Sequence, residues 1–159
     1  MSTNDPKPVP TLYEWMGGMP ALLRLMTTFY DRVPSDPILA PVFAGMSSEH
    51  PKHVATFLAE VFGGPKGYSS DLGGHGNMIR RHVGRALTET QRSRWLQFLL
   101  QCADEVGLPN DPEFRSAFVA YLEWGTRLAV INSQPGAAVS EDQPMPAWGW
   151  GEVKGPYKP

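Results

Sequence analysis

Four residues of this chain have the chemistry needed to bind a flat, iron-containing cofactor. His82 stands in MIRRHVGRAL, Trp95 in the apolar stretch RWLQFLL, Tyr30 ends LLRLMTTFY, and Phe43 stands in APVFAGM. A neutral imidazole can hold a haem iron from one side. A phenol O–H and an indole N–H can donate hydrogen bonds to a diatomic ligand on the other side. These residue types together indicate a haem site.

The composition describes an ordinary globular protein. The 159 residues suffice for one domain with a sizeable core, and 42% are hydrophobic and 19% charged. The formal net charge of -2 and the absence of a long basic run give no support for a nucleic-acid partner. Cys102 is the only cysteine, so no intrachain disulfide can form and a reducing compartment fits.

The sequence carries no sign of membrane insertion. Its first residues, MSTNDPKPVP, are polar and proline-rich and lack the apolar segment of a signal peptide. No apolar stretch approaches the roughly 18 residues that span a bilayer. We therefore expect a cytoplasmic monomer or homodimer.

Capping residues and helix breakers divide the first half of the chain. Residues 1–10 are expected to be a flexible lead-in, and residues 11–132 a single helical domain. Thr11 can cap a short helix that the glycines at 17–18 end. A second helix begins near Pro20 and ends at Pro34.

The middle of the chain contains a third helix and a glycine-rich segment. Ser47 or Ser48 can cap the helix, which has Pro51 in its first turn. We expect residues 66–77 to form an extended loop, followed by a short helix that carries His82.

Two further helices precede a tail of residues 133–159, which is rich in proline and glycine. Thr88 and Gln91 form a capping-box pattern before a long helix, and Asp111 can cap the last one. In the tail, Trp148 and Trp150 are candidates to dock on the body. No alternation typical of strands appears, so the fold class is all-α.

The segments in order resemble a truncated haemoglobin, most closely the second group of that family. The resemblance runs from about residue 11 to residue 132. Its marks are TLYEWMGG, FYDRVPSDPIL, TFLAEVFGGP and RRHVGRALTETQRSRWLQFL. It implies a two-over-two helical sandwich around haem b, in which a loop largely replaces the proximal helix.

The resemblance also implies roles for the four residues introduced above. His82 holds the iron through Nε2, while its Nδ1–H is bonded to a nearby carbonyl or other acceptor. The Trp95 indole and the Tyr30 hydroxyl point at the distal ligand. Phe43 packs against the porphyrin face.

Residues beside the proximal histidine are candidates to bind the haem propionates. Arg81 suits a carboxylate, and Tyr68 and Lys66 are further candidates. Arg80 is expected on a charged helix face. Three other residues receive structural expectations: His75 in the loop, Cys102 in the core and Met78 as a packing residue.

The histidines at 50 and 53 leave several interpretations open. They are exposed, they form a zinc pair, or only one of them has a role. Counting back from the GGP motif of the family places His50 at a distal gate and Val54 above the iron. His53 then lies nearer the propionate edge.

The sequence thus predicts a haem protein that reversibly binds O2 and other diatomic ligands such as CO and NO. Enzymatic alternatives are nitric oxide dioxygenation and peroxidase-like turnover, each of which needs an unidentified reductase. A gas-sensing or interaction module, with the tail docked on a partner, is another alternative. A fourth is a non-haem helical protein with a metal bound by the histidine pair.

Overall fold

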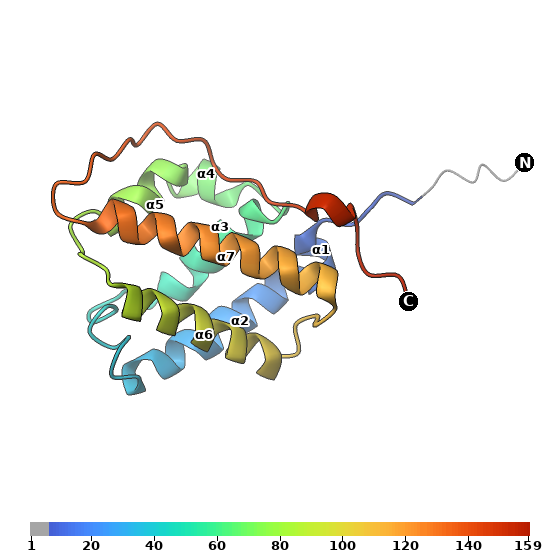
Figure 1. The fold of residues 1–159 in the computed structure, drawn as a ribbon, viewed down its shortest axis with the longest axis horizontal. Helices are drawn as coiled ribbons and strands as arrows, with labels where there is room; N and C mark the ends of the chain where they lie inside the picture. The colour runs from blue at the N-terminus through green and yellow to red at the C-terminus, as the bar shows by residue number, and fades with distance from the viewer. Residues whose placement is uncertain (1–6) are drawn as a thin grey trace, which may run out of the picture.

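The structure is a computed structural model that describes residues 7–159 (Figure 1). Most of the expected flexible lead-in, residues 1–6, lies outside the described residues. Across the described part the regular structure is helical, without strands, as predicted. The elements are α1 Leu12–Met16, α2 Gly18–Arg32, the 3-10 helix η1 Val33–Ser35, α3 His50–Val61, α4 Gly67–Asp71, α5 Gly74–His82, α6 Glu89–Glu105, α7 Pro112–Ser133 and the 3-10 helix η2 Gly151–Val153.

Four long helices form the body of the molecule. Helix α2 packs against α3 and α6, and α6 packs against α7, so two helix pairs enclose the core (Figure 1). Their inward faces are apolar, and residues such as Leu22, Phe29, Leu99 and Phe118 are fully buried. The short helix α5 packs on α4 and α7. Within residues 7–159, no helix is both long and apolar enough to cross a bilayer.

Three of the predicted helix caps are confirmed. Thr11 and Thr88 each form a complete capping box at the start of α1 and α6. Asp111 accepts a hydrogen bond from the backbone N–H of Phe114 at the start of α7. The predicted serine cap of α3 is wrong, because Glu49 occupies the N-cap without a side-chain hydrogen bond.

The expected extended loop over residues 66–77 is also wrong, since this segment contains α4 and the first four residues of α5. The Glu60 carboxylate of α3 accepts hydrogen bonds from the backbone N–H of Ser69, at 2.8 Å, and from its hydroxyl. These contacts satisfy donors near the start of α4. Gly73 and Gly74 have φ values of 88° and 64°, which let the chain turn sharply between the two helices.

Hydrogen bonds to the Asp36 side chain fix the start of the segment that carries Phe43. The Asp36 carboxylate accepts from the backbone N–H groups of Ile38 and Leu39, at 3.1 and 3.0 Å. The Arg94 guanidinium of α6 pairs with the same carboxylate at 2.6 Å. These bonds hold the pKa of Asp36 below its usual range against the opposing effect of burial, and they tie the α2–α3 connection to α6.

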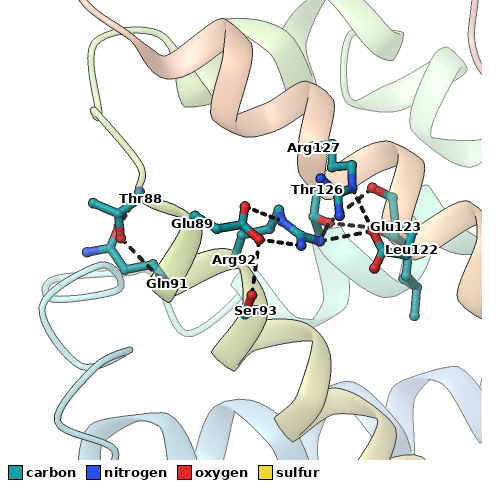
Figure 2. Close-up of polar contacts among 9 residues, drawn as sticks. All are labelled: Thr88, Glu89, Gln91, Arg92, Ser93, Leu122, Glu123, Thr126 and Arg127. Atoms are coloured by element: carbon teal, nitrogen blue, oxygen red, sulfur yellow. Dashed lines mark hydrogen bonds and ion pairs between the residues drawn. The ribbon is translucent and has the colours of Figure 1, made fainter.

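A second arginine joins α6 to α7 (Figure 2). The buried Arg92 guanidinium bonds to Glu89 at 2.6 Å and to Glu123 of α7 at 3.1 Å. It also lies 3.4 Å from the Thr126 hydroxyl. A guanidinium with several donors can satisfy acceptors on both helices at once. The start of α6 is therefore tied to the middle of α7.

The C-terminal tail docks on the body, as predicted for its two tryptophans. The backbone N–H of Trp148 donates to the carbonyl of Val61 at 2.8 Å. The indole N–H of Trp150 donates to the carbonyl of Pro10 at 2.7 Å. Its ring lies 6.0 Å from that of Trp15 in an edge-to-face arrangement. The tail thus closes against the end of α3 and the start of the chain.

The capping box of α6 provides a test of the fold. Thr88→Ala should lower the free energy of unfolding by about 1 kcal/mol, because the backbone N–H of Gln91 loses its acceptor. Thr90→Ala is the matched control, since Thr90 is exposed on the same helical turn. It should change the value by no more than about 0.5 kcal/mol in urea unfolding. Equal losses in the two variants would contradict this assignment of the cap.

Candidate functional site

A cavity of about 580 Å³ lies inside the helical sandwich, with walls from α2, α3, α5, α6 and α7. All but one of the residues predicted to contact a cofactor or ligand line it, and Lys66, the exception, is exposed at the start of α4. The lining residues among them are Tyr30, Phe43, His50, His53, Val54, Tyr68, Arg81, His82 and Trp95.

His82 is the last residue of α5, and its ring is held by the backbone of its own helix. Nδ1 lies 2.8 Å from the carbonyl oxygen of Met78, one turn earlier. A carbonyl only accepts, so Nδ1 carries the proton and Nε2 keeps its lone pair. Burial lowers the pKa of His82, so the ring is neutral near pH 7. The predicted contact with a carbonyl is present, and a neutral imidazole nitrogen is available to a metal.

Aromatic rings line another wall of the cavity. The ring centroid of Tyr30 lies 5.2 Å from that of Phe43 and 4.8 Å from that of His50, both edge-to-face. Tyr30 comes from α2 and His50 from the start of α3. Three parts of the chain therefore meet here: α2, α3 and the connection between them.

The indole of Trp95 joins this wall from α6. Its ring packs edge-to-face on Phe29 at 5.7 Å, and Phe29 packs in the same way on Tyr30 at 4.8 Å. Burial raises the pKa of the Tyr30 phenol, and the nearby indole N–H of Trp95 opposes this shift. The phenol consequently keeps its proton and can act as a donor. Tyr30 and Trp95, each a packed aromatic ring with one polar hydrogen, thus line the same cavity.

His50 is a neutral base in this wall. Burial, with the positive charge of Arg81 as the next cause, lowers its pKa to about 4. Its Nε2 is buried and without a hydrogen-bond partner in the described structure. His53 and Val54 follow on α3, and both are partly buried at the cavity wall. Of the alternatives left open for this pair, exposure to solvent does not apply to His50.

The cavity has a cationic side near α5. Arg81 is exposed yet lines the cavity, whereas Arg80 pairs with Glu141 of the tail at 3.0 Å. Tyr68 is buried, and its hydroxyl accepts a hydrogen bond from the Asn77 side chain at 3.2 Å. Burial raises the pKa of Tyr68, so its own O–H remains a donor. Arg81 and Tyr68 are thus suited to anionic groups at the rim.

Two features of the cavity were not predicted. His75 was expected in a loop but lies buried in α5, two turns before His82, and it lines the cavity. From α7, Tyr121, Trp124 and Gly125 also line it. Helical spacing places Tyr121 on the inward face of α7, and such spacing cannot separate a core wall from a cavity wall. Cys102 is fully buried and Met78 packs on the core, as expected.

These residues fit a haem better than a bare metal ion. Within residues 7–159, no three or more His, Cys, Asp or Glu side chains are grouped to hold a metal. The pair His50 and His53 therefore has no third ligand of these types. The neutral imidazole of His82, flat apolar walls and a guanidinium at the rim match an iron porphyrin with carboxylate groups.

A helical sandwich around such a cavity defines a globin, and comparisons with known proteins identify the family. The family model for bacterial-like globins matches residues 11–124. Group 2 truncated haemoglobin YjbI of Bacillus subtilis is 33% identical over 117 residues, which are 74% of this chain and 86% of that protein. The chain belongs to the bacterial-like globin family and is a group 2 truncated haemoglobin, as its motifs predicted.

Solved structures agree with this assignment. The truncated oxygen-avid haemoglobin of Bacillus subtilis superposes with a TM-score of 0.67 at 32% identity, over 76% of this chain and 99% of that chain. The group II truncated haemoglobin of Bacillus anthracis gives 0.71 at 25% identity, over 84% and 100%. The two-over-two fold is confirmed, and the chain is a haem globin that binds diatomic ligands.

The environment of His50 makes a testable prediction about pH. The imidazole should take up a proton only near pH 4, because charging it requires burying a cation beside Arg81. Titration of the histidine ring signals by NMR in the haem-free protein measures this, with His50→Gln used to assign the resonance. A midpoint near the ordinary histidine value of about 6.5 would contradict this description of the site.

Proposed function

We propose that this globin reversibly binds O2, and also CO and NO, at the five-coordinate ferrous iron of haem b held by His82. When bound, ferrous haem supplies an iron atom that takes up a diatomic gas reversibly. The observation that carries the proposal is the 2.8 Å contact between Nδ1 of His82 and the Met78 carbonyl, which leaves Nε2 as the free nitrogen. The similar truncated haemoglobin of B. subtilis is oxygen-avid, which supports the choice of O2.

The distal hydrogen bonds come from Tyr30 and Trp95. Both side chains line the cavity, and each pairs an apolar ring with one polar hydrogen. A polarised ligand accepts such hydrogen bonds more strongly than an apolar one. The apolar side chains of Phe43 and Val54 also line the cavity and exclude water from it. The two donors therefore favour O2 over CO.

The haem carboxylates are held at the cationic rim. Arg81 offers a guanidinium, which suits a carboxylate. Tyr68 offers its O–H, because the Asn77 amide already bonds to its oxygen. His53, one turn after the start of α3, also lines the cavity. These three residues orient the cofactor, and His82 fixes its iron.

His50 acts as the gate of the distal cavity. Its ring stands against Tyr30 and Phe43 at the N-terminal end of α3, where the loop before the helix is partly exposed. It stays neutral because its pKa is about 4. The imidazole can therefore move without separating an ion pair.

A redox reaction on the bound gas is a second candidate, favoured by this same neutral imidazole in the distal cavity. In peroxidase-like turnover His50 would accept a proton from the peroxide, and both this reaction and nitric oxide dioxygenation need an external reductase. A sensor whose tail docks on a partner is less well supported, because Trp148 and Trp150 bond to the body of the chain itself.

His82→Ala tests the iron ligand. The variant should lose stable haem binding, because it removes the protein's bond to the iron. Added imidazole should restore the ferrous spectrum in the variant and leave the wild-type spectrum unchanged. Haem content and absorption measure the result. Normal haem content with an unaltered spectrum would show that another residue holds the iron.

Trp95→Phe and Tyr30→Phe test the distal donors. Each should speed O2 dissociation, since a hydrogen bond to a strongly polarised partner contributes about 1.5–3 kcal/mol, or roughly 10- to 150-fold. CO dissociation should change much less. The double variant should show less than the sum of the two effects if both donors serve one atom. Equal acceleration for O2 and CO would mean that the rings act by packing alone.

His50→Ala tests the gate. CO association should quicken while haem content stays normal, because the ring that fills the entrance is removed. In the wild type, the association rate should be flat from about pH 6 to about pH 8, since His50 stays neutral throughout. Flash photolysis measures both quantities. Unchanged CO association and O2 dissociation in the variant would exclude both a gating and a donor role.

A further inference from the structure

The first part of the tail, residues 134–150, lies as a strap across the helix that carries His82. It leaves the C-terminal end of α7, passes α5 and α4, and returns towards α1 (Figure 1). The family model matches residues 11–124, so no residue of the strap falls within that match.

At Gly76 the strap approaches α5 backbone against backbone. A Cβ atom built on Gly76 of α5 would lie 2.6 Å from the carbonyl oxygen of Glu141. Such a distance is far inside van der Waals contact, and the obstructing atom belongs to the main chain. Glycine at this position is what allows the strap to lie directly on the helix.

Side chains on both sides of this contact reinforce it. The Glu141 carboxylate pairs with Arg80 at 3.0 Å, two residues before His82. Both side chains are about half exposed, so this pair alone contributes little. Burial lowers the pKa of the His75 imidazole, and the nearby backbone of Pro144 opposes that shift. The strap thus meets α5 on two successive turns, with Gly76 on one and Arg80 on the next.

The far end of the strap is anchored to the rigid body. The Trp148 ring packs on Tyr121 at 5.5 Å and on Trp124 at 5.9 Å, both from α7. Its backbone N–H bonds to Val61 at the end of α3. The strap therefore links α5 to two of the four core helices.

Helix α5 needs such a link. It has nine residues, Gly74–His82, and begins with glycine. Isolated helices shorter than about 12–15 residues are marginal, so its position depends on packing. Its direct neighbours are α4, of five residues, and α7.

We propose that the strap, through Glu141 seated on Gly76, is a positioning element that fixes α5 and so sets the placement of His82 and the retention of the cofactor. This inference rests on the proposed role of His82 for its haem consequences, but its first consequence, the order of α5, does not. No residue of the strap lines the cavity, so the strap acts on the cofactor only through α5.

Gly76→Ala tests the proposal, because the strap reverses the sign of its effect on the stability of α5. In a helix without the strap, alanine would stabilise the turn by about 1 kcal/mol relative to glycine. With the strap in place, the new methyl group pushes Glu141 away and α5 loosens. Gly149→Ala is the matched control, because a Cβ at that strap position meets nothing within 4 Å.

The first readout is hydrogen exchange of the α5 amides in the haem-free full-length protein. Gly76→Ala should speed exchange about fivefold or more, which corresponds to roughly 1 kcal/mol, while Gly149→Ala should match the wild type. Slower exchange in Gly76→Ala would overturn the proposal. This readout stands even if another residue proves to hold the iron.

The second readout uses the haem-loaded proteins. Haem transfer to excess apomyoglobin should quicken several-fold in Gly76→Ala, and the iron–histidine stretching band should broaden or shift. Glu141→Gln should act in the same direction by about two- to threefold, with Asp142→Asn unchanged as its neighbour control. If Gly76→Ala fails to fold, Glu141→Gln decides the matter. Loss rates equal to the control variants would overturn the proposal.

Discussion

The hydrogen bond from Nδ1 of His82 to the Met78 carbonyl is the interaction on which the site depends. It fixes the tautomer and the rotation of the ring, and it presents Nε2 as the available nitrogen. Because donor and acceptor lie one turn apart in one short helix, the ring is positioned only as well as α5 itself. The placement of His82 therefore also depends on the contacts of α5 with α7, α4 and the strap.

The distal side follows a different principle, because its polar groups are carried on packed aromatic rings. The Phe29 ring packs edge-to-face against both Tyr30 and Trp95. The ion pair of Asp36 with Arg94 fixes the turn that brings Phe43 to the same wall. Burial keeps the Tyr30 phenol protonated and His50 neutral. A wall whose nearby donors, Tyr30 and Trp95, are neutral suits a neutral gas.

Local signals predicted much of this molecule. The capping boxes at Thr11 and Thr88 lie within a few residues, so sequence alone located them, and the motifs around His82 and Trp95 indicated the family and the site. Interactions between distant residues could not be read in this way. The Glu60 contacts that stabilise the start of α4, within residues 66–77, come from α3, and the strap contact at Gly76 comes from residue 141. The glycines of residues 66–77 predict a loop from sequence alone, whereas in the structure they permit a turn between helices and a close backbone approach.

The most direct test of the central claim is resonance Raman spectroscopy of the five-coordinate ferrous protein with ¹⁵N-labelled histidine. The iron–histidine stretching band should shift with the label in the wild type. In His82→Gly supplied with unlabelled imidazole, the same band should return without the isotope shift. A band that still shifts with labelled protein in His82→Gly would mean that a different histidine holds the iron, and it would contradict the account built on Nε2 of His82.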